Sequence, residues 1–214
     1  MSDYRAPLEE ITFALETVGG LKEWSGLPGY DEAGEELVAA VLEETGKLAA
    51  EVMAPTNKIG DKQHPELVDG GVKTPEAFKP MHQAFVEGGW STLSADPELG
   101  GQGLPATLSL AVNEMLTSAN MAYSLQSLLT TGAIEAIHAH GSAELKEKYL
   151  PNMVSAVWSG AMNLTEPSAG SDVGALRSKA LPQEDGSYLI SGQKIFITWG
   201  DHDLSDNVIH LVLA

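Results

Sequence analysis

Residues 162–175 read Met-Asn-Leu-Thr-Glu-Pro-Ser-Ala-Gly-Ser-Asp-Val-Gly-Ala, and residues 192–198 read Gly-Gln-Lys-Ile-Phe-Ile-Thr. The first stretch is a loop in which Gly170 and Ser171 present successive backbone N–H groups beside a hydroxyl. Such a concave set of donors suits a pyrophosphate, although an ordinary capped turn between a strand and a helix uses the same residue types. Asp172 would repel phosphate, so we expect its carboxylate to accept backbone N–H groups and hold the loop. The second stretch is an apolar run of strand character that ends on a threonine.

The overall composition excludes several classes of function. The chain has 214 residues, of which 43% are hydrophobic and 20% are charged, as is typical of a folded globular protein. Thirty acidic residues against 12 basic ones give a net charge of −18. Nucleic-acid binding and docking on an anionic membrane both need a basic surface, so neither is expected. The acidity suits an ordinary cytoplasmic surface, and docking of a basic redox partner is the alternative.

The sequence carries no features of a secreted or membrane-spanning protein. It contains no cysteine, which excludes disulfides and thiolate metal sites. The first residues lack a basic segment followed by an apolar run, and no apolar stretch approaches the ~20 residues that span a bilayer. We therefore expect a cytoplasmic protein without membrane insertion.

Apolar residues at helical spacing predict helices in the first part of the chain. One is predicted over residues 35–53, ending at Ala54-Pro55, and residues 55–73 are predicted to form a loop. A second helix is predicted to begin at Thr74 as its cap and to end at Gly88-Gly89. Pro80 lies inside it, so this helix should be kinked or start late.

The following residues predict a turn-rich loop and three further helices. The loop covers residues 96–105, and two apolar stripes follow at residues 108–116 and 125–137. Ser142 is predicted to cap a short helix that closes before Pro151. Roughly the first 157 residues should therefore form an all-helical bundle.

The hydrophobic period changes from helical spacing to alternation at Trp158, which predicts strands from there onward. Asp185-Gly186 is a strong hairpin turn between strands predicted at 177–181 and 187–191. Two more strands are predicted at 194–199 and 207–214. The last strand is apolar and ends without a turn or polar tail, and because such an edge invites aggregation we expect the chain to be truncated there.

Together these segments resemble the acyl-CoA dehydrogenase family. Residues 165–172 are similar to the family's first signature, Thr-Glu-x-x-small-Gly-Ser-Asp, and Asn163 departs from the small residue that the family usually has there. The extended N-terminus is similar to that of larger bacterial members such as the 3-methylmercaptopropionyl-CoA dehydrogenase-like group. Further similarity lies in the loop at 96–103, in Lys-Tyr-Leu-Pro at 148–151, and in Gly-Gln-Lys at 192–194.

The resemblance implies an α+β fold with two parts. Residues 1–157 would form an N-terminal all-helical bundle domain, with an N-terminal extension over residues 1–34. Residues 158–214 would form the first strands of a β-barrel-like middle domain, which is incomplete in this chain.

The resemblance also implies that the first signature binds FAD and acyl-CoA. The backbone at Leu164 and Thr165, with the Thr165 hydroxyl, would meet the pyrimidine edge of the flavin. Gly170 and Ser171 would contact the FAD pyrophosphate, and Ser171 would also lie near the CoA of the substrate.

The second segment matches the family's Trp-Ile-Thr. The ring of Phe196 would flank the isoalloxazine, Ile197 would line the same site, and Thr198 would hydrogen-bond near the flavin N5. Phenylalanine in place of tryptophan keeps the apolar wall and loses the indole N–H. Trp199 replaces a common asparagine, which changes the hydrogen bonding at this position.

The implied reaction is α,β-dehydrogenation of an acyl-CoA thioester, with electrons passed to an electron-transfer flavoprotein. The family's catalytic glutamate belongs to a C-terminal helical domain that this chain lacks, and Glu166 does not match it, so no catalytic residue is assigned. We expect this chain alone to be inactive and the full-length protein to be a homo-oligomer. The alternatives are an acyl-CoA oxidase or flavin monooxygenase of the same fold, or a short non-catalytic chain that binds acyl-CoA or a partner.

Two other features of the helical part have simpler explanations than ligand binding. His138 and His140 lie two apart on a helix and diverge, so they are predicted to cap its C-terminus and not to bind a metal. Residues 121–128 could line the acyl pocket, but ordinary helical core is the favoured interpretation.

Overall fold

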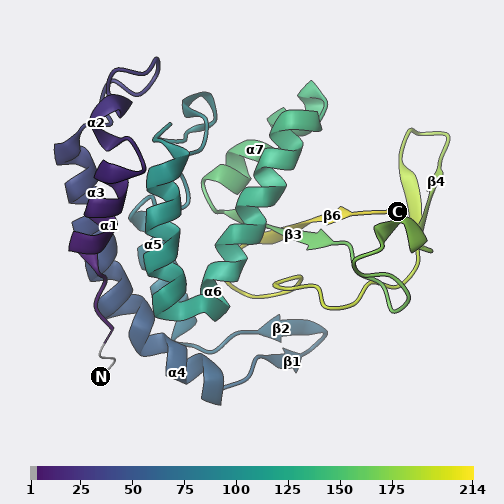
Figure 1. Ribbon diagram of the computed structural model, residues 1–214. Helices are drawn as coiled ribbons and strands as arrows, with labels where there is room; N and C mark the ends of the chain where they lie inside the picture. The colour runs from purple at the N-terminus through teal and green to yellow at the C-terminus, as the bar shows by residue number, and fades with distance from the viewer. Residues whose placement is uncertain (1–3) are drawn as a thin grey trace.

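The computed structural model describes residues 4–214, and residues 1–3 of the predicted N-terminal extension lie outside this range. Figure 1 shows a group of helices from which a strand-bearing part projects beyond α6 and α7. The helices are α1 (Leu8–Thr17), α2 (Leu21–Trp24), α3 (Glu35–Lys47), α4 (Ala54–Lys62), α5 (Phe78–Glu87), α6 (Ala106–His140) and α7 (Ala143–Val154), and the strands are β1 (Glu66–Val68), β2 (Gly71–Lys73), β3 (Trp158–Asn163), β4 (Lys179–Pro182), β5 (Tyr188–Ser191) and β6 (Asn207–Val212).

The core of the helical part forms where α3, α5 and α6 turn their apolar stripes toward one another. Two clusters of buried side chains lie on either side of Val41 and Leu104, which contact both. Tyr123 on α6 is fully buried in one cluster, where its ring makes edge contacts with Phe78 and Phe85. The predicted α+β chain with a helical first part is confirmed, although that part also contains the short β1–β2 hairpin.

The helix predicted to end at Ala54-Pro55 instead continues. α3 passes through a π-helical stretch, Leu48–Met53, into α4, so the loop predicted over residues 55–73 is wrong. Proline is tolerated in the first turn of a helix, and the widened π turn accommodates the break in the hydrogen-bond ladder. Residues 66–73 of the predicted loop form the β1–β2 hairpin.

Thr74 does not cap the helix that was predicted to begin there. Its backbone N–H and its hydroxyl both donate to Asp203 Oδ1, at 2.9 and 2.7 Å, and α5 begins only at Phe78. Pro80 therefore falls in the first turn of α5, where its missing N–H costs no intrahelical bond. The late start that Pro80 predicts is confirmed.

The last helix extends further than its sequence predicts. Ser142 Oγ accepts a backbone N–H in the first turn at 3.3 Å, so the predicted cap is confirmed. However, α7 continues through Pro151 to Val154. Met153 and Val154 are buried, and Met153 packs near Gly160 of β3. This burial outweighs the single backbone hydrogen bond that the proline removes.

The two helices predicted around residues 108–116 and 125–137 run on as α6, which is kinked at Asn120. Asn120 has φ −154° and ψ 86°, far from helical values. Its side chain replaces what the backbone loses: Oδ1 accepts from the Tyr123 N–H at 3.1 Å, and Nδ2 donates to Thr56 Oγ1 at 2.8 Å. Asn120 thus caps the second half of α6 and ties it to α4.

The strand-bearing part contains two pairs of strands. β3 pairs in parallel with β6, from Trp158 opposite Asn207 to Asn163 opposite Val212. β4 and β5 form the hairpin predicted around Asp185-Gly186. Within residues 4–214 the sheets have two strands each and close no barrel.

The strand predicted over residues 194–199 is wrong. Phe196 and Trp199 have φ values of 58° and 53°, in the left-handed region that an extended strand cannot use. One backbone bond remains, from the Ile195 N–H to the Thr165 carbonyl at 2.9 Å. The indole of Trp199 instead donates to the Ala122 carbonyl of α6 at 2.8 Å, which pulls the chain toward the helices.

Asn120→Ala tests the origin of the kink. We expect the free energy of unfolding to fall by about 2 kcal/mol, because the variant removes a helix cap and a buried hydrogen bond. Chemical denaturation measures this change. Asn113→Ala, at an exposed position on the same helix, is the control and should change stability by about 0.5 kcal/mol or less. Equal losses in both variants would contradict the capping role.

A buried histidine predicts a loss of stability in mild acid. His82 Nδ1 lies 2.7 Å from the Tyr123 hydroxyl, and burial, with the nearby His202, lowers the pKa of His82 to about 4. The native state therefore binds fewer protons than the unfolded chain between pH ~6.5 and pH ~4. The free energy of unfolding should fall as the pH falls through this window, by on the order of 3 kcal/mol.

Denaturation at a series of pH values checks this dependence. His82→Gln should flatten the curve, leaving the smaller slope from His202, whose pKa burial also lowers. His64→Gln, at an exposed position, should keep the full slope. An unchanged slope in His82→Gln would contradict the assignment.

Candidate functional site

The structure brings the two decisive segments of the sequence together. The Ile195 N–H donates to the Thr165 carbonyl at 2.9 Å, and Lys194 Nζ donates to the Leu164 carbonyl at 3.0 Å. Gly170 folds back beside Thr165, so that a Cβ at Gly170 would lie 3.8 Å from the Thr165 methyl group. The loop of the first segment and the start of the second therefore form one continuous surface.

A buried carboxylate holds this surface together. The side chain of Glu166 is 3% exposed, and its Oε1 lies 2.9 Å from Lys194 Nζ. Oε2 accepts from the Arg177 N–H at 2.7 Å, and Oε1 accepts from the Ser178 N–H at 3.0 Å. Hydrogen bonds from Ser178, Arg177 and Lys194 lower the pKa of Glu166 to about 2. The carboxylate is thus ionised, and it joins its own loop to residues 177–178 and to Lys194.

This role of Glu166 was not found from the sequence. The residue was recognised there only as part of a signature that does not supply the catalytic base. The structure supports that exclusion, because a carboxylate with so low a pKa and no exposed face is a poor proton acceptor. Lys194, in Gly-Gln-Lys, is the one cation of the second segment, and this could have identified it as the partner of Glu166.

The loop N–H groups and the hydroxyls predicted to meet a ligand have no hydrogen-bond partner among the described residues. Gly170 and Ser171 are exposed, and neither their N–H groups nor the hydroxyls of Ser171, Thr165 and Thr198 hydrogen-bond to any residue among 4–214. Asp172 Oδ1 accepts from the Gly174 N–H at 3.1 Å, which confirms that its carboxylate holds the loop. The donors beside it stay available to an acceptor outside the chain.

The second segment adds an apolar surface to these donors. The Phe196 side chain is 87% exposed, at a backbone φ of 58°, and Ile197 is half-buried beside it. Hydroxyls, peptide N–H groups and an aromatic ring suit a flavin, whose pyrimidine carbonyls and pyrophosphate accept hydrogen bonds and whose ring system is flat and apolar. The residues present therefore fit FAD in their chemistry.

Two departures from the family pattern have partners in the structure. Asn163 Nδ2 lies 2.8 Å from His210 Nδ1 on the paired strand β6. Trp199 donates its indole N–H to α6 and stacks on Phe78, with ring centroids 6.4 Å apart. Each unusual residue thus joins segments that are distant in the sequence.

A cavity of about 530 Å³ lies away from these segments. It is lined by both halves of α6 and by the loop before it, but by none of the residues predicted to bind FAD. Within residues 121–128, Gln126 and Ser127 line this cavity, Tyr123 and Ser124 are buried, and Met121 and Leu128 are each 61% exposed. The prediction that residues 121–128 are helical core therefore holds for the buried face of this stretch and not for its exposed face.

The described residues offer few other sites. His138 Nε2 lies 3.5 Å from Asp96 Oδ2 on the preceding loop, and residues 4–214 contain no group of three or more candidate metal ligands. No helix in this range is both long and apolar enough to cross a membrane.

Glu166→Gln tests the buried carboxylate. We expect amide hydrogen exchange at Arg177 and Ser178 to rise on the order of tenfold, because an amide side chain cannot replace both charged acceptor oxygens. Mass spectrometry of exchange in the 214-residue chain measures this. Glu184→Gln, at an exposed position in the β4–β5 turn, is the matched control and should leave exchange unchanged. Unaltered exchange in Glu166→Gln would show that the carboxylate does not hold the loop.

Both parts of the chain are similar to known proteins. The family model described as acyl-CoA dehydrogenase, N-terminal domain, matches residues 38–156, and that for the acyl-CoA dehydrogenase middle domain matches residues 161–213. The chain is 46% identical over 211 residues to the 3-methylmercaptopropionyl-CoA dehydrogenase of Ruegeria pomeroyi. That alignment covers 99% of this chain and 36% of the relative, so the chain spans about a third of the relative's length.

Two solved structures share the fold and are each 26% identical in sequence to this chain. Glutaryl-coenzyme A dehydrogenase in complex with glutaryl-CoA has a TM-score of 0.63 and 26% identity, over 76% of this chain and 39% of that one. A chain from work on the electron transferring flavoprotein of Acidaminococcus fermentans and flavin-based electron bifurcation has a TM-score of 0.64 and 26% identity, over 75% and 39%. Since the family models match the helical and the strand-bearing parts alike, the chain belongs to the acyl-CoA dehydrogenase family.

Proposed function

We propose that this chain forms one wall of the FAD and acyl-CoA site of a flavin-dependent acyl-CoA dehydrogenase. The observation that carries the proposal is the joining of the two signature segments by Glu166 and Lys194, with unpaired donors left on the outer surface. The relatives named above, a 3-methylmercaptopropionyl-CoA dehydrogenase and a glutaryl-CoA complex, support an acyl-CoA thioester as the substrate class.

Seven residues would hold the cofactor in this proposal. The loop contributes peptide and hydroxyl donors for the pyrimidine edge and the pyrophosphate, with Ser171 also near CoA. The second segment contributes an aromatic wall and a hydroxyl. These residues are Leu164, Thr165, Gly170, Ser171, Phe196, Ile197 and Thr198.

The two segments offer no free cation to a phosphate. Lys194 is the one cation in the two segments, and its side chain is 10% exposed because it faces Glu166. The loop must therefore bind phosphate through peptide and hydroxyl groups, as concave sets of N–H donors do in other phosphate sites. FAD, when bound, supplies the two-electron acceptor for oxidation of the Cα–Cβ bond of the thioester. No described residue is assigned as the base that removes the α-proton.

We further propose that the electrons pass to an electron-transfer flavoprotein. The similarity to a chain from the Acidaminococcus fermentans electron transferring flavoprotein work supports this choice. The net charge of −18 favours a partner with a basic docking surface. A homo-oligomeric full-length protein remains a prediction.

The test uses the full-length protein that carries this sequence, loaded with FAD. Anaerobic addition of an acyl-CoA should bleach the flavin absorbance, and electron-transfer flavoprotein should restore it. Rapid oxygen consumption in place of transfer to that partner would instead indicate an oxidase. Failure to bind FAD would contradict the proposal.

Ser171→Ala tests the pyrophosphate contact. Loss of a neutral hydrogen bond should raise the dissociation constant for FAD by about three- to tenfold. Flavin fluorescence during titration of the apoprotein measures it. Ser168→Ala, an exposed serine in the same loop, is the control and should bind FAD as the unaltered protein does. Equal weakening by both substitutions would contradict the role given to Ser171.

A further inference from the structure

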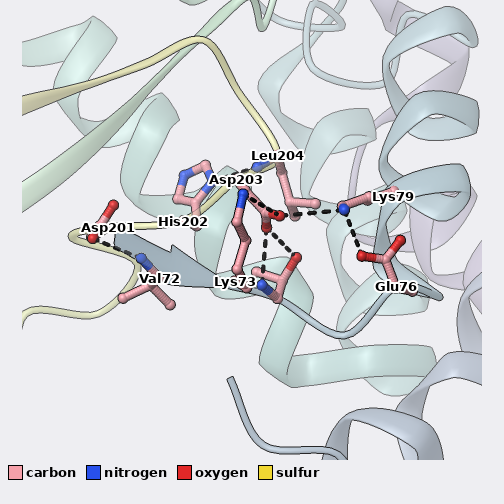
Figure 2. A network of polar contacts seen from close by, with 9 residues as sticks. Val72, Lys73, Glu76, Lys79, Asp201, His202, Asp203 and Leu204 are labelled. Carbon is pink, nitrogen blue, oxygen red and sulfur yellow. Dashed lines mark hydrogen bonds and ion pairs between the residues drawn. The ribbon is translucent and has the colours of Figure 1, made fainter. Parts of the chain in front are cut away.

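The chain returns to the helical part directly after the second signature segment. Trp199 docks on α6 and Phe78, and the residues that follow, Asp201-His202-Asp203, lie against β2 and the start of α5. Figure 2 shows the side chains of Asp201 and Asp203 directed at Val72 on one side and at Lys73 and Lys79 on the other. The side-chain hydrogen-bond partners of Trp199, Asp201 and Asp203 all lie in the helical part, and none belongs to the loop at residues 162–175.

Asp203 makes the most contacts in this loop. Its side chain is 14% exposed, and Oδ1 accepts both the N–H and the hydroxyl of Thr74. Oδ2 lies 3.4 Å from Lys79 Nζ and 3.7 Å from Lys73 Nζ, as ion pairs (Figure 2). Burial opposes ionisation, but the hydrogen bonds from Thr74 and the ion pair with Lys79 lower the pKa of Asp203 to about 2. The carboxylate is therefore charged at neutral pH.

The two residues before Asp203 hold two further strands. Asp201 Oδ2 accepts from the Val72 N–H of β2 at 3.0 Å. His202 is 6% exposed; its Nδ1 accepts from the Leu204 N–H at 3.1 Å, so the ring proton lies on Nε2, which is 2.9 Å from Ser159 Oγ of β3. Three consecutive side chains thus fix the loop to β2, β3 and the residues before α5.

The segment from Phe196 to Thr198 is consequently held at both ends, and within it the Ile197 carbonyl accepts the Gly200 N–H at 3.2 Å in a local turn. On one side, Ile195 is bonded to Thr165; on the other, Trp199 is bonded to Ala122. Between these points the backbone takes a left-handed conformation at Phe196, which costs free energy and persists only where the surroundings impose it. The surroundings on the C-terminal side are the contacts of Trp199 and of residues 201–203, together with the Gly200 carbonyl, which lies 2.8 Å from His210 Nε2 of β6.

We propose that Asp201-His202-Asp203 is a latch between the helical part and the strand-bearing part, and that Asp203 is a positioning residue for the cofactor-facing segment Phe196–Thr198. The effect on FAD affinity rests on the proposed function. The latch itself is a property of this chain alone.

Hydrogen exchange tests the latch without any cofactor. Asp203→Asn and Asp203→Ala should raise amide exchange at Thr74 and across residues 197–204 by about 10- to 100-fold, since both remove a charged acceptor. Thr74→Val, which keeps the backbone donor, should give a smaller rise. Asp206→Asn removes the same charge from an exposed position in the same loop and is the matched control. Exchange in β4–β5 should not change in any variant.

FAD affinity of the full-length protein tests the positioning role. Asp203→Ala should weaken FAD binding by about tenfold, because the binding-competent arrangement is less populated, and Asp206→Asn should not. Unchanged exchange overturns the latch, and faster exchange with unchanged FAD affinity overturns the positioning role. An unaltered protein that binds no FAD overturns the proposed function instead, while the exchange experiment still decides the latch.

Discussion

The candidate site depends on one buried carboxylate. Glu166 is the second residue of the first signature, and it accepts hydrogen bonds from the N–H groups of Arg177 and Ser178 and from the ammonium of Lys194. A buried charge of this kind is tolerated only when it is paired and its oxygens accept hydrogen bonds, and here both conditions are met. Because its partners come from two other segments, residues 177–178 and Lys194, the position of the loop and that of the second segment are set together. The outer donors of the loop are then free to face a ligand.

The helical part supplies the surface on which this arrangement rests. The kink at Asn120 lets α6 contact α4 through Thr56 while its second half packs against β3. Ala122, just beyond the kink, accepts the indole N–H of Trp199. The backbone conformation of Asn120, in the helical core, therefore helps to set the position of the Ala122 carbonyl, to which the strand-bearing part is attached through Trp199.

The sequence predicts much of this architecture, because most helices are specified by local spacing. Period, caps and turn residues identified α5, both halves of α6, the cap of α7 and the β4–β5 hairpin. The errors arose where tertiary contacts override local signals. Pro55 and Pro151 read as helix ends, yet burial carries the helices past both, and Thr74 reads as a cap but binds Asp203, more than a hundred residues away. The strand predicted at 194–199 failed for the same reason, since Trp199 binds α6. The signature residues were recognisable from their pattern, whereas the pairing of Glu166 with Lys194 needed the structure.

The protonation of Glu166 in the folded chain tests this account most directly. Titration of its side-chain carboxyl carbon by ¹³C NMR would report the pKa of this one group. The hydrogen bonds from Ser178 and Arg177 and the ion pair with Lys194 predict a pKa of about 2. A value near 4.5, the pKa of an ordinary glutamate, would show a solvated carboxyl that does not join the two segments.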